Sequence, residues 1–335
     1  MRTEISDQTP DETAAHTYVR DLLDHAAAVR LPELFASPHP DALYQLPNRH
    51  GVSVVALRTS SLSQEQLTHI LTYRLAQYLI TGMIDADLIY QTQMPHEPFS
   101  SVSAKDIHVV AGSPETGQIF CYMVLKTLEV ALPAASLRTQ NRPLFPVEQV
   151  FGSGIYNHLN ILPDLPITRV SELARFVKNH QLDSRDQGGA RSPVEMGVAL
   201  YRILCDSPRQ EIAVVVGLIE ERVAKRNLDF FHVPTVVIRG VAPCGIPAAY
   251  ASDSFRSRKF YPFAFLVSDF ARQTSRLAAI ERALEQPGEQ GIRALLALKR
   301  DSEFDGSSLE PREGLVPLID PELRHYPTAG GSGAG

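Results

Sequence analysis

The chain has 335 residues, of which 44% are hydrophobic and 21% are charged, and its formal net charge is −6. This composition is ordinary for a globular protein with a full hydrophobic core. The acidic balance argues against a nucleic-acid-binding protein, which normally carries a basic surplus. No apolar run approaches the roughly 20 residues that span a bilayer, so we expect no integral membrane segment. The acidic N-terminus also lacks the apolar segment of a secretory signal.

Cysteine and histidine usage excludes two further kinds of site. The three cysteines lie far apart and form no C-x-x-C pair, which favours free thiols in a reducing compartment, and we expect a cytoplasmic protein. The eleven histidines show no H-x-x-x-H or H-E-x-x-H spacing, so we predict no metal site. Cys244 could act as the nucleophile of a hydrolase. No histidine stands in a recognisable relation to it, and we favour a buried free thiol.

The first half of the chain predicts a helix followed by a strand meander with a second helix inserted. Apolar residues at helical spacing and serine caps identify the second helix. The two strands after it are joined by a hairpin turn with a glycine at each end. In chain order we expect a helix, an irregular proline-rich connection, a strand, an amphipathic helix and two strands, over residues 11–30, 31–50, 51–59, 61–83, 106–111 and 118–129.

The second half is organised around residues 168–204, which predict a strand, a polar glycine-bearing loop and a helix. The segment before it, 147–161, is ambiguous. After it we expect a strand, a helix, two further strands, a helical stretch broken near Pro287 and a tail rich in proline, glycine and acids, over residues 212–218, 219–231, 235–240, 260–270, 275–298 and 301–335. This order indicates an α+β (mixed α/β) fold with an antiparallel first half and a crossover in the second.

Charged and flexible residues gather in the central stretch. Glu172 and Arg175 interrupt an otherwise apolar strand. The loop that follows carries the five candidates for anion binding, Arg185, Gly188, Gly189, Ala190 and Arg191. Such a loop collects free backbone N–H groups at the positive end of a helix, which suits a phosphate or pyrophosphate. An acid beside an anion-binding loop is what a group-transfer enzyme with a phosphorylated carrier would need.

The order and spacing of these motifs resemble the GNAT-type acyltransferases, over roughly residues 65–245. Arg185, Gly188 and Ala190 occupy the positions of an R-x-x-G-x-A stretch between the fourth core strand and the next helix. Residues 172–176, Glu-Leu-Ala-Arg-Phe, look like the E-[LI]-[SA]-R-F signature of the acyl-homoserine-lactone synthases and the related N-acyl amino acid synthases. Residues 74–78 are similar to the R-x-x-x-[FY] stretch of that branch. Asp106 stands where the branch has an aspartate-containing strand.

Two departures from that branch weigh against lactone formation rather than against acyl transfer. Val124 stands where lactone synthases have a strand arginine, with Lys126 two residues further on. The chain also has no tryptophan, although many lactone synthases have one near the N-terminus.

For the fold, the resemblance implies a GNAT-like central twisted mixed sheet flanked by helices, over residues 61–271. We expect the rest of the chain to form a partly helical N-terminal extension (1–60), a C-terminal helical extension (272–325) and a flexible tail (326–335). The resemblance also implies a bulge in the central strand. Glu172 and Arg175 are three residues apart and would face opposite sides of a regular sheet, so only a bulge brings them together.

For the function, the resemblance implies an N-acyltransferase that moves an acyl group from an acyl-CoA or acyl-carrier-protein thioester to the primary amine of an amino-acid-like acceptor. Glu172 would be the general base with Arg175 beside it. The 185–191 candidates would hold the phosphates of acyl-CoA or acyl-phosphopantetheine, a co-substrate rather than a tightly bound cofactor. The acceptor site would be shaped by Arg74, Tyr78, Asp106 and Phe176.

Each of these residues also has a purely structural interpretation. Glu172 could face solvent, Arg175 could serve as an ion-pair partner, and the 185–191 loop could simply be solvated. Arg74 could be a solvated helix residue and Tyr78 a core residue. His108 could be a second base, but we favour an ordinary surface histidine. At the level of the whole protein, the alternatives are a catalytically degenerate GNAT fold that binds an acyl carrier or a protein partner, and a hydrolase that uses Cys244. A homodimer is left open.

Overall fold

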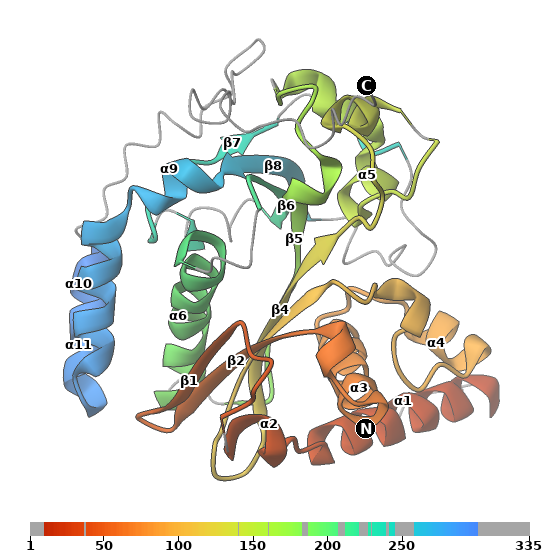
Figure 1. Cartoon of the computed structure of the whole chain (residues 1–335). Coiled ribbons are helices and arrows are strands. Elements are labelled where there is room, and N and C mark those ends of the chain that lie inside the picture. The colour runs from red at the N-terminus through yellow and green to blue at the C-terminus, as the bar shows by residue number, and fades with distance from the viewer. Residues whose placement is uncertain are drawn as a thin grey trace, which may run out of the picture.

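The computed structural model describes residues 10–36, 38–139, 141–159, 161–182, 187–206, 212–220, 227–228, 230–238, 241–244 and 258–300. Within this part of the chain one mixed sheet has the strand order β1-β2-β3-β4-β5-β6-β8-β7 (Figure 1). The strands are β1 (Tyr44–Arg49), β2 (Val52–Arg58), β3 (Ile107–Gly112), β4 (Ile119–Thr127), β5 (Val170–Lys178), β6 (Val214–Glu220), β7 (Val236–Val237) and β8 (Phe260–Leu266). The predicted α+β mixed sheet is confirmed.

Helices cover both faces of this sheet. The α-helices are α1 (Pro10–Ala28), α2 (Pro32–Ala36), α3 (Gln64–Ile80), α4 (Ala86–Thr92), α5 (Pro146–Phe151), α6 (Gln187–Tyr201), α9 (Val267–Ala271), α10 (Thr274–Glu285) and α11 (Gly288–Arg300). Figure 1 shows α1, α3 and α4 together on one side of β1–β5, and α6, α10 and α11 on the other. Separate apolar clusters fill the α3 side, the α6 side, and the space between α5 and β5, β6 and β8.

Strands β1 to β5 pair antiparallel, each with the next along the chain. The β1–β2 turn consists of His50 (φ 52°) and Gly51 (φ 83°), and two positive φ values are what a tight two-residue hairpin requires. Strand β6 pairs parallel with β5, and β8 pairs antiparallel with β6 and with β7. Two parallel neighbours need a crossover, and the connection through α6 supplies it.

The central strand β5 carries the bulge that the family resemblance implied. Tyr122 of β4 pairs with Val177, whereas Val124 pairs with Ala174, so β5 has one residue more than β4 over this interval. Within the extra length Arg175 adopts φ 59°, in the left-handed region. A residue inserted this way reverses the side-chain alternation beyond it.

Strands β5 and β6 part beyond their fourth pair. Their pairing ends at Leu173 and Gly217, although β5 continues to Lys178 and β6 to Glu220. A Cβ on Gly217 would lie 2.6 Å from the carbonyl oxygen of Leu173, so glycine permits the close approach at the last pair. The bulge and the separation of β5 from its parallel neighbour therefore occur together in the chain.

Several predicted boundaries need correction. Segment 31–50 is not irregular throughout, because it contains α2 and the edge strand β1, where Pro47 is tolerated. Strands β1 and β2 join the sheet, which therefore begins before residue 61. Strand β6 runs into the helix predicted at 219–231, and residues 267–271 form α9 instead of strand. The broken helix at 275–298 is confirmed as α10 and α11, and residues 301–335 lie outside the described part.

Candidate functional site

Glu172 lies on β5 facing α5, and its side chain is buried, with the residue 1% exposed. Both carboxylate oxygens lie 3.2 Å from the backbone nitrogen of Val147, whose N–H donates from the first turn of α5. Burial raises the pKa of Glu172 to about 8, and this rise is opposed by the Val147 N–H and by the cations Lys126 and Arg175. The solvent-facing interpretation of Glu172 is therefore wrong. The carboxyl group can gain or lose a proton near neutral pH.

Arg175 lies on the same face of β5 as Glu172 because of the bulge. Its guanidinium is 3.8 Å from the carboxylate of Glu97 and lies over the ring of Tyr78, with 5.6 Å from Cζ to the ring centroid. Glu97 comes from the segment between α4 and β3, and it was not predicted from the sequence. Arg175 has an ion-pair partner, and its side chain is 19% exposed, so it keeps some access to the surface of the site.

Arg74 of α3 is buried and also forms an ion pair with Glu97. The interpretation of Arg74 as a solvated helix residue is therefore wrong. One carboxylate thus bridges two guanidinium groups, and Arg74 additionally lies 5.3 Å from the centroid of the Tyr122 ring. Tyr78 is buried in the same place, and burial raises its pKa. The structure therefore brings Arg74, Tyr78 and Arg175 together around Glu97, and the role of Arg74 and Tyr78 in an acceptor site stays a prediction.

Asp106 is buried at the start of β3 and is fully engaged by its surroundings. Its carboxylate accepts hydrogen bonds from the Lys126 ammonium at 2.7 Å and from the Thr127 and Ser103 N–H groups at 3.0 Å each. Lys126 stands opposite Glu172 in the register of β4 and β5, and its charge opposes the rise that burial causes in the pKa of Glu172. Lys126, which the sequence did not single out for a role, is thus hydrogen-bonded to Asp106 and acts electrostatically on Glu172.

Phe176 follows Arg175 directly in the bulged stretch. It is 41% exposed, one of the few large apolar residues with such exposure in the described part of the chain. A half-exposed aromatic ring beside the separation of β5 and β6 is consistent with its predicted contact with substrate, which stays a prediction.

The described residues among those predicted to bind phosphate belong to a helix and not to a loop. Arg185 lies outside the described residues. Gly188, Gly189 and Ala190 belong to the first turn of α6, which begins at Gln187. A Cβ on Gly188 would lie 2.7 Å from the ring of Phe120, so glycine lets the helix start close to β4. That these residues contact phosphate stays a prediction. The contacts would be made by backbone N–H groups at the N-terminus of α6.

Arg191 occupies a different environment from the one expected. Its guanidinium is buried and donates to the carbonyl oxygens of Leu284 at 2.9 Å, Gln286 at 2.6 Å and Gly288 at 3.1 Å. These three carbonyls lie at the junction of α10 and α11. The described contacts of Arg191 therefore tie α6 to the C-terminal helices.

A buried ion pair fixes α5 and hence the Val147 N–H beside Glu172. Arg142 and Glu148 are both buried, and the Nη1 atom of Arg142 lies 3.0 Å from Oε2 of Glu148. Glu148 also accepts the Phe145 N–H at 2.7 Å, which closes the first turn of the helix. The pair was not predicted from the sequence, and Glu148 stands in the segment of ambiguous pattern, 147–161.

The burial of His108 and of Cys244 is the opposite of what the sequence predicted. His108 is fully buried rather than on the surface, and burial lowers its pKa to about 3. Cys244 is exposed rather than buried, and its Sγ lies 3.5 Å from the carbonyl oxygen of Val150. Across the described residues there is no group of three or more histidine, cysteine or acidic side chains that could hold a metal ion.

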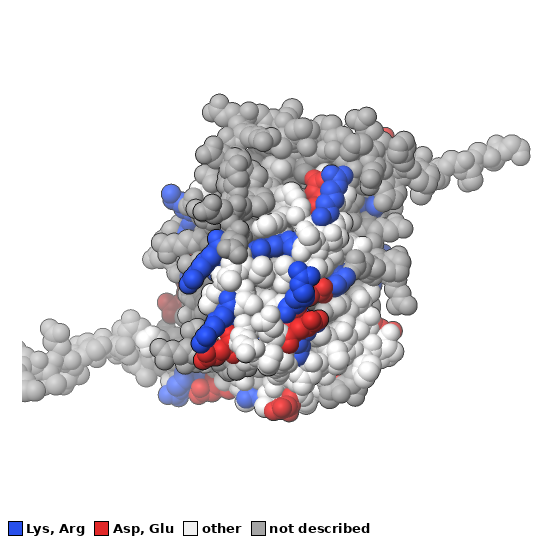
Figure 2. All heavy atoms as spheres, turned by 90° about the vertical axis from the view of Figure 1, so that its left-hand side faces the viewer, with Lys and Arg blue, Asp and Glu red and all other residues white. Residues whose placement is uncertain are grey.

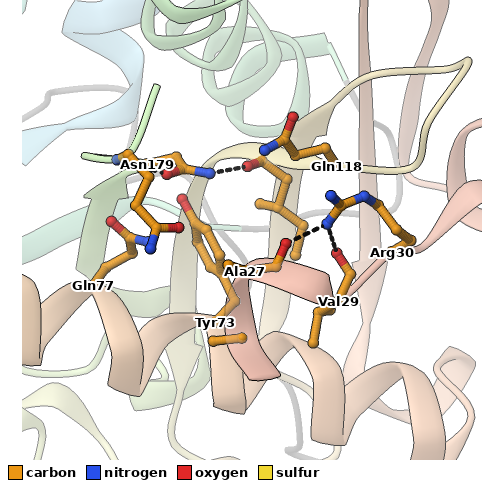
Figure 3. Close-up of a pocket in the computed structure, with 10 residues that line it drawn as sticks. Ala27, Val29, Arg30, Tyr73, Gln77, Gln118 and Asn179 are labelled. Atoms are coloured by element: carbon orange, nitrogen blue, oxygen red, sulfur yellow. Dashed lines mark hydrogen bonds between the residues drawn. The ribbon is translucent and has the colours of Figure 1, made fainter. Parts of the chain in front are cut away.

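A small cavity of about 10 Å³ lies between α1, α3 and the neighbouring ends of β4 and β5 (Figure 3). Tyr73, Gln77, Gln118 and Asn179 are among the residues that line it. This volume suits about one water molecule and excludes a substrate. The cavity is thus separate from the site around Glu172.

The surface formed by the C-terminal helices carries mixed charge. Arg272 pairs with Asp269 at 3.5 Å, and Arg293 pairs with Glu289 at 2.7 Å. Figure 2 views the side of the molecule on which α10 and α11 lie in Figure 1, and basic and acidic side chains are interspersed there. None of the helices that the structure describes is both long and apolar enough to cross a membrane.

Comparison with known proteins gives structural similarity without close sequence similarity. No family model matches the chain, and no curated protein matches it. Similar solved structures include the AHL synthase LasI (12% identity, TM-score 0.43, 66% of this chain and 91% of that one). They also include the CoA-dependent acyl-homoserine lactone synthase BjaI with SAM and isopentyl-CoA (12% identity, TM-score 0.39, 72% of this chain and 97% of that one). A third is FeeM, an N-acyl amino acid synthase from uncultured soil microbes (11% identity, TM-score 0.36, 66% of this chain and 94% of that one).

These solved structures come from the branch that the sequence motifs resemble. Every TM-score is below 0.5 and every identity below 20%. The chemistry of the site therefore follows from the arrangement of its own residues: the bulged β5, the buried Glu172 and the paired arginines.

Proposed function

We propose that the protein is an N-acyltransferase that moves an acyl group from an acyl-CoA or acyl-carrier-protein thioester to the primary amine of an amino-acid-like acceptor. The observation that supports this most is the bulge of β5. It places a carboxyl group with a pKa of about 8, Glu172, on the same face as Arg175, at the point where two parallel strands separate.

In the proposed reaction the amine nitrogen attacks the thioester carbonyl directly, in a complex of both substrates. The N–C bond forms, the C–S bond breaks, and the amine proton passes to Glu172 through water. Glu172 then returns a proton through water to the leaving thiolate, so the carrier leaves as a free thiol and the base is regenerated. A base with a pKa near the working pH is well suited to this proton transfer. Backbone N–H groups of β5 beyond Leu173, which do not pair with β6, would polarise the thioester carbonyl.

Charge in the site supports an acceptor with a carboxylate. Arg74, Arg175 and Lys126 supply three positive charges, and Glu97 and Asp106 supply two negative charges. The sum is one positive charge while Glu172 is protonated and zero once it is ionised as the base. The side chain of Arg175 is 19% exposed and 3.8 Å from its carboxylate partner, so it is the cation that an acceptor carboxylate could approach, and charged pairs interact strongly away from water. The first turn of α6 would hold the phosphates of the carrier through its backbone N–H groups.

One experiment tests the base. Free thiol release from acyl-CoA is followed with a panel of amino acids as acceptors, for the wild type and Glu172→Gln. We expect the wild-type rate to rise with pH to a plateau above about 8, and the variant to lose about 100-fold to 10,000-fold without that rise. Glu65→Gln, at an exposed position, is the matched control. Full turnover in Glu172→Gln would remove the base from the mechanism.

One observation favours the non-catalytic alternative, in which the fold only binds an acyl carrier. Glu172 is 1% exposed, so base catalysis requires water to reach a closed position. Calorimetry with coenzyme A and long-chain acyl-CoA distinguishes the two functions. Binding with no thiol release for any amine, from acyl-CoA or acylated carrier protein, would support the non-catalytic alternative.

A further inference from the structure

A continuous chain of side-chain contacts runs from the end of β2 to the ion pairs of the candidate site. The Oγ1 of Thr59 lies 2.8 Å from Nε2 of His108, and Nδ1 of His108 lies 2.8 Å from the hydroxyl of Tyr122. At one end of the chain, Nη1 of Arg74 is 3.4 Å from the Tyr122 hydroxyl. At the other end, Oγ1 of Thr59 is 3.4 Å from the backbone carbonyl oxygen of Asp106.

The two ends determine the direction of every hydrogen bond between them. Arg74 can only donate, so the Tyr122 oxygen accepts there and its proton goes to Nδ1 of His108. The carbonyl of Asp106 can only accept, so the Thr59 hydroxyl donates to it and accepts the Nε2–H of His108. The opposite direction would leave the buried Tyr122 proton without an acceptor, which is costly. His108 is thus the neutral tautomer protonated at Nε2.

The surroundings of His108 keep it neutral. It is fully buried on β3, and burial is the largest cause that lowers its pKa, followed by the cations Arg74 of α3 and Lys126 of β4. Asp106, just before β3, is engaged by Lys126 and by backbone N–H groups. A neutral ring with one donor and one acceptor nitrogen is therefore maintained in the centre of the site.

The position of Arg74 depends on this chain. Its Nε has no hydrogen-bond partner among the described residues, so its orientation rests on the contacts of its terminal nitrogens with Tyr122 and Glu97. Glu97 in turn contacts Arg175 at the bulge.

We propose that His108 is a positioning residue of the acceptor site. Its Nδ1 accepts a hydrogen bond from the Tyr122 hydroxyl and thereby orients Arg74 and, through Glu97, Arg175. The catalytic consequence rests on the proposed acyl transfer, whereas the hydrogen-bond direction does not.

The direction is tested by nitrogen-15 NMR of the imidazole rings, with the His108 signals assigned by their loss in His108→Leu. We expect an unprotonated Nδ1 and a protonated Nε2 that do not change between pH 5 and 8. A proton on Nδ1, or titration within this range, would overturn the proposal. This measurement needs no activity, so it remains decisive if the acyltransferase proposal fails.

The positioning role is tested by rescue. In His108→Asn the amide oxygen takes the place of Nδ1 and can still accept from Tyr122, whereas His108→Leu and Tyr122→Phe break the link. We expect the KM for the amine to rise about tenfold in the two broken variants, with a smaller change in kcat, and about threefold or less in His108→Asn. Equal losses in His108→Asn and His108→Leu would contradict the proposal. His16→Leu, at an exposed position on α1, is the matched control, and thermal melting confirms that each variant is folded.

Discussion

Replacing Glu172 with glutamine should change how the stability of the protein depends on pH. The pKa of Glu172 is raised by burial from 4.5 to about 8. Between these two values the unfolded chain releases the proton and the folded chain keeps it. The contribution of this group to stability is therefore most favourable below about pH 4.5 and is lost as the pH rises towards 8. Glutamine stays neutral and can still accept the Val147 N–H. The variant should therefore not lose stability through this position as the pH rises.

The size of the effect follows from the two pKa values. Linkage gives a slope of about 1.4 kcal/mol per pH unit between them, flattening near 8. From pH 5.5 to 7.5 the wild type should lose about 2.5 kcal/mol of unfolding free energy through this group alone. Glu195, buried on α6 with a pKa raised to about 7, adds a loss in the same direction in both proteins. The difference between variant and wild type cancels that contribution.

Urea denaturation at pH 5.5, 6.5 and 7.5 measures this difference. We expect the unfolding free energy of Glu172→Gln to exceed that of the wild type by an amount that grows with pH. For the exposed control Glu65→Gln we expect the difference from the wild type to show no such growth. A difference that does not depend on pH would show that Glu172 is ionised throughout this range. The reasoning about its buried environment, and its suitability as a base near neutral pH, would then be refuted.

Three further substitutions test the framework of the site. Gly217→Ala places a methyl group 2.6 Å from the Leu173 carbonyl and should lower the melting temperature, because the last β5–β6 pair must shift; an unchanged melting temperature would contradict this. Arg142→Met leaves the buried carboxylate of Glu148 unpaired and should cost about 3–5 kcal/mol in urea denaturation, whereas a loss below 1 kcal/mol would show that the pair is dispensable. Arg191→Met should accelerate hydrogen exchange in α10 and α11 while β3 stays protected, since three carbonyls lose their donor.

Local pattern and motif order predicted much of the fold and part of the site. The hairpin strands and the capped helix α3 followed from alternation, turn residues and Ser63, because these depend on neighbours in sequence. Periodicity alone would have placed Glu172 and Arg175 on opposite faces. Only the motif resemblance implied the bulge, since one inserted residue reverses the alternation without altering composition.

What could not be predicted depends on contacts between distant segments. Glu97 is an ordinary acid in a short connection, and its role arises only when α3 and β5 bring two arginines to it. Residues 188–193 have the composition of a loop, including Pro193, yet they form helix. The contact of Gly188 with Phe120 and the anchoring of Arg191 on α10 and α11 override that local preference.

The unequal lengths of the strand connections have a consequence for the order in which the molecule folds. Strands β1 and β2 are linked by residues 50–51, and β3 and β4 by residues 113–118, so these hairpins close with little loss of chain entropy. The parallel patch between β5 and β6 closes a much longer loop, because residues 179–213 separate the two strands along the chain, and it consists of four residue pairs. We therefore expect it to close late in folding and to reopen first under native conditions. The point where β5 and β6 separate is thus also where the folded chain can open locally while the antiparallel strands β1 to β5 stay paired.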